Sequence, residues 1–133
     1  MPSILPRVFR VVVPAADIDR SSTFYARLFE SSGERIAPGR HYFHLGDVIL
    51  VCVGRDSTAR PNPEPIDFAA DDLDALFARA QAAGCSWLEE KIETRPWGER
   101  SFTAKDPFGN TLYFVDAATC FTGFHPPPTH DEA

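Results

Sequence analysis

The chain has 133 residues, close to the usual size of one compact domain, with a formal net charge of −6 and no run of basic residues. Nucleic acid is therefore not an expected partner, since phosphate binding needs clustered Lys and Arg. No apolar run approaches the ~18 residues of a membrane-spanning helix, and the N-terminus lacks the pattern of a signal peptide. The widely spaced Cys52, Cys85 and Cys120 indicate free thiols in a reducing cytoplasm.

The first half of the chain is predicted to have the order β-α-β-β-β. Val8 to Val13 is β-branched and apolar except for Arg10, which is typical of a buried strand. A helix capped by Asp17 or Asp19 follows and ends at Ser31-Ser32-Gly33. Three further strands complete the half: Glu34 to Ala37, His41 to Leu45, and Val48 to Val53.

The second half repeats this order after a polar, proline-containing linker at residues 55–63. Ile66 to Ala70 forms a strand, the helix Leu73 to Ala83 ends at Gly84, and Trp87 to Thr94 forms the next strand. Both helices follow an Ala-Ala-Asp sequence, which indicates a duplicated unit of about fifty residues. We expect one domain over residues 1–117, with units at 6–54 and 64–117, and a loosely ordered or partner-bound tail at 118–133.

The last two strands of the second half are joined by Asp106-Pro107-Phe108-Gly109-Asn110. Proline presets φ for a type I turn and glycine takes the left-handed position, so a bulged hairpin is predicted that pairs Thr103 with Tyr113. Because side chains alternate along a strand, one face is apolar and the other part polar. The apolar face holds Phe102, Ala104, Leu112 and Phe114, and the other Ser101, Thr103, Thr111, Tyr113 and Val115.

These features together resemble the vicinal oxygen chelate superfamily of glyoxalases, ring-cleaving dioxygenases and bleomycin-resistance proteins. The resemblance rests on the two units, on Phe24-Tyr25, on Asp72-Leu73-Asp74 and on the hairpin at Asp106, over roughly residues 6–117. It implies an α+β fold in which two tandem β-α-β-β-β units form a cup-shaped mixed sheet with helices outside. The sequence Pro96 to Phe102 looks most like the drug-sequestering and uncharacterised branch, where a tryptophan matching Trp97 borders the ligand groove.

Enzymes of this superfamily hold a divalent metal with His, Gln or Glu side chains. The resemblance places their four ligand positions on Arg10, Leu50, Pro65 and Tyr113. An alignment shifted by one residue would put Glu64 in place of Pro65, and one carboxylate would not hold a metal. Because a catalytic metal normally needs three protein ligands, we expect neither a metal nor another cofactor here.

The interior of the cup is predicted from strand parity, starting from Arg10, Pro65 and Tyr113. A two-residue turn at Gly46-Asp47 pairs Phe43 with Leu50 and His41 with Cys52, and we expect this set to point inward. The predicted ligand-binding lining has Trp97 at its rim and comprises Arg10, His41, Phe43, Leu50, Cys52, Asp67, Ser101, Thr103 and Tyr113.

Four of these residues have both a structural and a functional interpretation. An inward Arg10 needs a partner, either Asp67 in a structural ion pair or an anionic group of a ligand. Trp97 either stacks on a ligand or lies in a subunit contact. His41 is either a hydrogen-bonded histidine or a base, and Tyr113 is either a hydrogen-bonding residue of the pocket or a general acid.

The expected function is metal-free sequestration of a small molecule, with no catalytic residue assigned and with the cup completed by a second copy of the chain. The acidic charge favours a cationic ligand, whereas Arg10 favours an anionic group on an aromatic molecule, so the identity of the ligand is left open. The alternatives are a lyase or isomerase, either with displaced metal ligands or using Tyr113 or His41 for proton transfer, and a structural or regulatory partner-binding domain.

Overall fold

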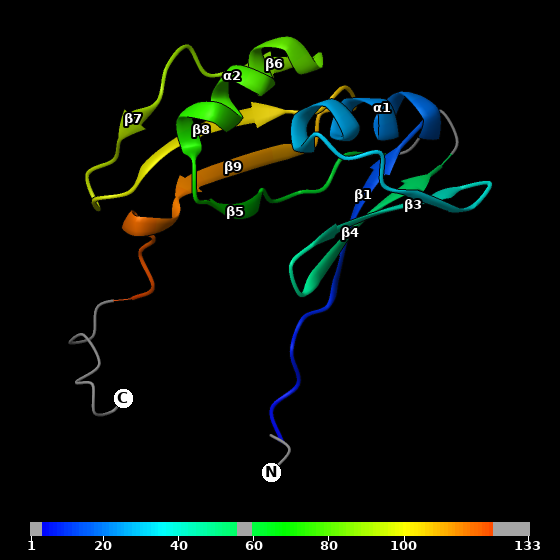
Figure 1. The fold of residues 1–133 in the computed structure, drawn as a ribbon, viewed down its shortest axis with the longest axis horizontal. Coiled ribbons are helices and arrows are strands. Elements are labelled where there is room, and N and C mark those ends of the chain that lie inside the picture. Colours follow the sequence, from blue (N-terminus) through cyan, green and yellow to red (C-terminus); the bar gives the residue numbers. More distant parts are fainter. Residues whose placement is uncertain (1–3, 56–59, 124–133) are drawn as a thin grey trace.

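The computed structural model describes residues 4–55 and 60–123. It contains two mixed sheets and two helices in the predicted β-α-β-β-β order, which confirms the α+β fold (Figure 1). The elements are β1 (Arg10–Ala15), α1 (Ile18–Phe29), β2 (Glu34–Ala37), β3 (Arg40–Leu45), β4 (Val48–Gly54), β5 (Ile66–Ala70), α2 (Leu73–Ala83), β6 (Trp87–Leu88), β7 (Glu93–Thr94), β8 (Arg100–Lys105), β9 (Thr111–Asp116) and the 3₁₀ turn η1 (Ala117–Thr119). Within these residues no helix is long and apolar enough to cross a membrane.

The first sheet has the strand order β1-β4-β3-β2, with β1 parallel to β4 and the other pairs antiparallel. Its β3–β4 register pairs Phe43 with Leu50 and His41 with Cys52, as predicted. The strand β1 begins two residues later than the predicted Val8 and runs on through Pro14 and Ala15. The chain before Val8 extends away from the body of the protein (Figure 1), whereas the Phe9 carbonyl still accepts a hydrogen bond from the Ile49 N–H.

The faces of β3 and β4 are the reverse of the prediction. Phe43 is 1% exposed and contacts the rings of Tyr25 and Phe29 on α1, so it points into the core. Leu50 and Cys52 are fully buried with it, and His41 packs on the Phe43 ring. These four side chains therefore do not line a cup. The parallel register explains why, because Arg10 pairs with Ile49, so Leu50 shares the core face of Val11 and not the face of Arg10.

The second sheet has the order β5-β9-β8-β6, with β7 also paired to β8. The single strand predicted for Trp87 to Thr94 is instead the two short strands β6 and β7. Leu88 pairs with Ala104 and Glu93 with Ser101. The chain advances five residues from Leu88 to Glu93, whereas their partners on β8 are only three residues apart. Two extra residues therefore bulge out of the ladder, and this interruption separates the strands.

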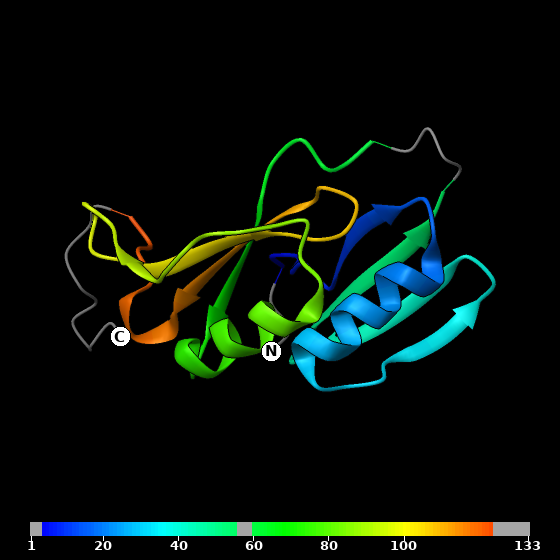
Figure 2. The same cartoon turned by 90° about the horizontal axis from the view of Figure 1, so that it is seen from above.

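The helices begin and end largely where the sequence indicated. Asp17 caps α1 and accepts a hydrogen bond from the Arg20 N–H, while Asp72 caps α2. Gly84 ends α2 with φ at 99°, in the left-handed region that glycine favours. The two helices pack against each other where the units meet (Figure 2). Their apolar sides and both sheets enclose one core.

The turn after β8 connects the two units. The hairpin register is confirmed, with Thr103 opposite Tyr113, and the Asp106 carboxylate accepts hydrogen bonds from the backbone N–H groups of Phe108 and Asn110. It also accepts from the Tyr25 hydroxyl at 2.6 Å, and burial, reinforced by the Asp106 charge, raises the pKa of Tyr25 well above its usual value. The Asn110 amide group donates to the carbonyl of Pro14. The turn that closes the second unit is therefore bonded to α1 and β1 of the first.

Candidate functional site

The face of each sheet that is turned away from α1 and α2 is called the open face here. In the second sheet, Asp67 pairs with Tyr113 and Tyr113 with Thr103, so these side chains share the open face. The alternate residues Phe68, Phe102 and Phe114 stack on one another on the helix side. Ser101, two residues before Thr103, also faces the open side and is fully buried there by its neighbours.

Glu99 is the centre of a hydrogen-bond network on this face. Its Oε1 accepts the Trp97 Nε1–H at 2.7 Å and the Tyr113 hydroxyl at 2.9 Å. Its Oε2 accepts the backbone N–H of Phe121 at 2.9 Å. Burial alone would raise the pKa of Glu99, but these three hydrogen bonds outweigh it and lower the pKa, so the side chain is a carboxylate near neutral pH.

A paired arginine lies beside this network. The Arg95 guanidinium donates to both carboxylate oxygens of Glu89, at 2.6 and 3.1 Å. It also donates to Ser101 Oγ at 2.7 Å and lies 6.0 Å from the Tyr113 ring centroid. The Arg95 hydrogen bonds lower the pKa of Glu89 despite its partial burial. The charges of Arg95 and Glu89 neutralise each other, and the bidentate contact holds the bulged segment between β6 and β7 beside the open face.

Asp67 lies on β5 next to Tyr113. Partial burial, and secondly the charge of Glu99, raise the pKa of Asp67. The same residue borders a pocket of about 310 Å³ between the two units, whose apolar walls come from β1, the β3–β4 hairpin and β5. The pocket is lined by Val8, Val11, Leu45, Val48, Ile66, Asp67, Phe68 and Ala69.

Arg10 lies on the open face of the first sheet and is exposed, so the premise of a buried guanidinium was wrong. Its Nη1 donates to the Tyr42 hydroxyl at 3.2 Å, and its guanidinium lies over the Phe9 ring. Across residues 4–55 and 60–123 no carboxylate forms an ion pair with Arg10, so the expected pair with Asp67 is not found. An exposed, hydrated guanidinium does not require such a partner.

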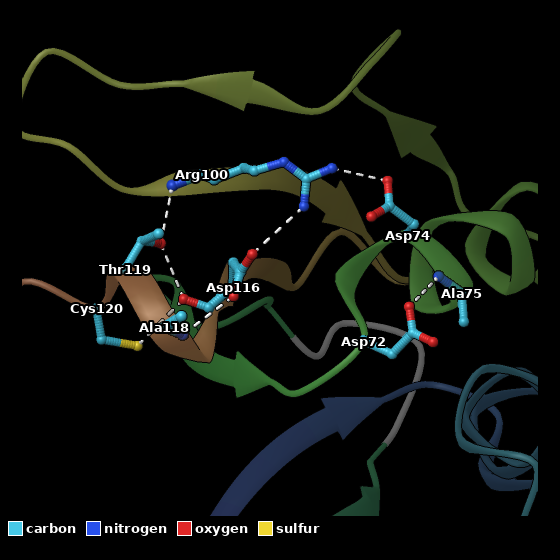
Figure 3. A network of polar contacts seen from close by, with 8 residues as sticks. All are labelled: Asp72, Asp74, Ala75, Arg100, Asp116, Ala118, Thr119 and Cys120. Carbon is cyan, nitrogen blue, oxygen red and sulfur yellow. Dashed lines mark hydrogen bonds and ion pairs between the residues drawn. The ribbon is translucent and has the colours of Figure 1, made fainter.

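The segment after β9 is held at the edge of this site, beside Glu99. Arg100 forms ion pairs with Asp74 at 2.7 Å and Asp116 at 3.4 Å, and its backbone N–H donates to Thr119 Oγ1 (Figure 3). These contacts position the chain so that the N–H of Phe121 reaches Glu99. The described part of the predicted tail, residues 118–123, packs against Glu99 and Arg100, and the expectation for its remainder lies outside the described residues.

The superfamily's metal positions do not fit a divalent ion in this chain. Arg10 and Tyr113 supply a guanidinium and a phenol, and Leu50 points into the core. Its neighbours Ile49 and Val51, which pair with Arg10 and Val12 on the open face, are equally unable to bind a metal. No group of three or more His, Cys, Asp or Glu side chains suited to a metal occurs in the described part of the chain.

Sequence reasoning missed three residues that organise the site, namely Glu89, Arg95 and Glu99. Glu99 could have been found, because it has the same strand parity as Ser101 and Thr103. The Glu89–Arg95 pair gave no such signal, since it forms across the unpredicted bulge between β6 and β7.

The paired β-α-β-β-β units, with helices on one side of the sheets and open faces on the other, are the architecture of the vicinal oxygen chelate proteins. The sequence profile of the Glyoxalase/Bleomycin resistance protein/Dioxygenase superfamily matches residues 7–114. The chain belongs to this superfamily. No curated protein sequence matches it.

Solved structures with the same fold include members with different activities. A glyoxalase-related enzyme from Fulvimarina pelagi is 17% identical with a TM-score of 0.72, over 90% of this chain and 94% of that one. A bleomycin resistance determinant encoded on transposon Tn5 is 19% identical with a TM-score of 0.66, over 84% and 98%. A lactoylglutathione lyase from Agrobacterium tumefaciens is 21% identical with a TM-score of 0.62, over 86% and 96%. At these identities the similarity establishes the fold alone.

Proposed function

We propose that this protein binds and sequesters a small molecule without a metal, on the open face of its second unit. The proposal rests mainly on Trp97, whose indole is 51% exposed yet is oriented by its hydrogen bond to Glu99. An ordered but exposed aromatic ring next to a polar network is a typical surface for stacking a ligand. Asp67, Thr103 and Tyr113 are the proposed polar contacts, and the adjoining pocket at Val8 and Val48 would take an apolar group. Ser101, which the sequence also placed in the lining, is fully buried and bonded to Arg95, so it does not reach a ligand.

Replacing Trp97 by Ala is expected to weaken ligand binding by up to about tenfold, because aromatic stacking contributes about 0.5–1.5 kcal/mol. The melting temperature should stay nearly unchanged, since the ring is half exposed. Benzyl alcohol, benzoate and benzylammonium serve as probes of one shape and three charges, and binding is measured by calorimetry and thermal shift.

The matched control for this variant is Trp87→Ala, which removes an indole that is 49% exposed on β6. It should leave probe binding unaltered. If Trp97→Ala lowers the melting temperature strongly while probe binding persists, Trp97 belongs to a structural contact. If no probe binds the unmodified protein, the binding proposal loses its support.

We further propose that the protein is a homodimer. β1 and β5 each form one edge of their sheet, and the apolar side chains of Val12 in β1 and of Val8 and Phe9 just before it are exposed. Exposed apolar edge strands favour association, and a second copy would cover them.

The dimer predicts that Val12→Asp yields a monomer, because a charge at the centre of the edge would be buried at the contact. Val12 is 40% exposed, and the control Ile36→Asp changes a side chain that is 48% exposed on the far edge strand β2. Light scattering after size-exclusion chromatography measures the mass. A monomeric unmodified protein, or a dimer that persists in Val12→Asp, would contradict this arrangement.

A lyase or isomerase is the second candidate, favoured by the hydrogen bond between the Tyr113 hydroxyl and Glu99. Burial raises the pKa of Tyr113, with the Glu99 charge and hydrogen bond adding to it, so the phenol stays protonated and can serve as an acid. His41 does not share this role, because its ring packs on Phe43 and its Nε2 contacts the Ser32 carbonyl. Turnover of a bound carbonyl compound that is lost in Tyr113→Phe would favour the enzyme over sequestration.

A further inference from the structure

We propose that the open face of the second unit selects an organic cation, a ligand carrying an ammonium or guanidinium group, held between Glu99, Asp67 and the ring of Trp97. This inference deepens the proposed binding function and rests on it, since it names the class of ligand for the same face.

The first observation is an uncompensated charge at Glu99. The residue is only 9% exposed, covered by Trp97, Tyr113 and the segment at Phe121. In the part of the chain that the structure describes, no Lys, Arg or His forms an ion pair with it. A covered carboxylate without a counter-charge is costly, so it gains most from a cation that enters from outside.

The second observation is that one acceptor position of Glu99 is left over. A carboxylate has about four lone-pair sites. Two hydrogen bonds reach Oε1, and one, from Phe121, reaches Oε2. The remaining position on Oε2 can accept a hydrogen bond from an ammonium group without displacing any of the three donors.

The third observation is the charge balance of the face. Its one arginine, Arg95, is bound through both terminal nitrogens by Glu89 and cannot also neutralise Glu99. Asp67 on the neighbouring strand carries a second carboxylate, and the charge of Glu99 contributes to raising the pKa of Asp67. The register also places Lys105 and Glu93 on this face, beside Thr111 and Ser101, and their opposite charges cancel in the sum. With Arg95 and Glu89 counted as a neutral pair, Asp67 and Glu99 remain, and the face has a negative potential.

An organic cation fits this surface better than a metal ion. Trp97 presents a half-exposed ring beside the carboxylate, and aromatic faces attract ammonium and guanidinium groups. A hard divalent ion prefers several free carboxylate or carbonyl oxygens, whereas three protein donors already occupy those of Glu99. In the sequence, the acidic charge favoured a cationic ligand, whereas Arg10 favoured an anionic group. Because Arg10 lies on the open face of the other sheet, it does not oppose a cation at this site.

The test compares benzylammonium and benzyltrimethylammonium with benzyl alcohol and benzoate, at low ionic strength, in full-length protein. A Trp87→Phe background leaves Trp97 as the single tryptophan, so quenching of its fluorescence reports binding at this face. Calorimetry gives the affinities. We expect both cations to bind at least about tenfold more tightly than the alcohol, and benzoate to bind most weakly.

Three charge-removing variants locate the effect. Glu99→Gln keeps an acceptor for Trp97 and Tyr113 and should reduce the preference for cation over alcohol about tenfold. Asp67→Asn, at an exposed position, should reduce it to a smaller extent without affecting stability, so the inference can be tested even if Glu99→Gln folds poorly. The control Glu34→Gln removes the same charge from exposed β2 and should change nothing.

The possible results distinguish a failure of the binding function from a failure of the cation selectivity alone. If no probe binds, the proposed function itself fails. If benzyl alcohol or benzoate binds as well as the cations, or if neither Glu99→Gln nor Asp67→Asn alters the preference, the function stands and the cation selectivity is wrong. Saturable binding of Mg²⁺ or Zn²⁺ without binding of the organic cations would overturn it in favour of a metal. A gain in cation affinity in Arg10→Gln would overturn it too, by showing that a partner's arginine already neutralises the face.

Discussion

Replacing Asp106 by Ala is expected to lower the free energy of unfolding by about 3 kcal/mol or more, a large part of the stability of an ordinary domain. The carboxylate is fully buried and accepts from the Tyr25 hydroxyl, from two backbone N–H groups and from the Asn110 amide group. Removing it leaves these donors buried without an acceptor. Each such donor costs about 1–3 kcal/mol, which is more than the net value of the bond that is lost.

Urea denaturation followed by circular dichroism measures this loss. The control is Asp47→Ala, at the exposed turn between β3 and β4, and it should change the free energy by no more than about 0.5 kcal/mol. A loss at Asp106 as small as that of the control would show that the turn does not hold the units together.

The second large effect is expected for Phe43→Ala, at about 3–5 kcal/mol of stability. Its ring is buried among Tyr25, Phe29 and His41, and truncation leaves a cavity under α1. The neighbouring Tyr42→Ala points to the open face and should cost far less. Because the original expectation placed Phe43 in the ligand lining, this pair of variants distinguishes the two faces directly.

The two measurements for this pair are thermal denaturation and probe binding at a temperature where the variant is folded. Binding by folded Phe43→Ala should match that of the unmodified protein, since the ring is on the helix side of the sheet. A stable variant with weakened binding would return Phe43 to the ligand site and reverse the assignment of the faces.

The contrast between the two hairpins shows what the sequence can determine. Around Asp106 the turn residues set the register, and the alternation of Phe102, Ala104, Leu112 and Phe114 with polar residues sets the face, so both predictions were right. In β3, His41 and Phe43 alternate with Tyr42 and His44, so each face receives an aromatic ring and a histidine. Turn chemistry still fixed the register there, but polarity could not choose between the faces.

The interactions of the candidate site were only partly predictable for a related reason. Parity along β8 and β9 brought Ser101, Thr103 and Tyr113 to one face. The contacts of Glu99 with Trp97 and with the backbone of Phe121 arise where a turn and the chain after β9 meet. Spacing within one strand carries no information on such contacts, because they depend on how separate segments end near one another.

The corresponding turns of the two β-α-β-β-β units differ in their contacts. The turn between β8 and β9 joins the two units, because the Asn110 amide group donates to the Pro14 carbonyl and the Asp106 carboxylate accepts from the Tyr25 hydroxyl. At the corresponding place in the leading repeat, a side chain added at Gly46 would meet no atom within 4 Å. The two units therefore differ at the turn that joins them. A hypothetical protein assembled from two copies of the first unit would therefore lack the hydrogen bonds by which this turn joins the units.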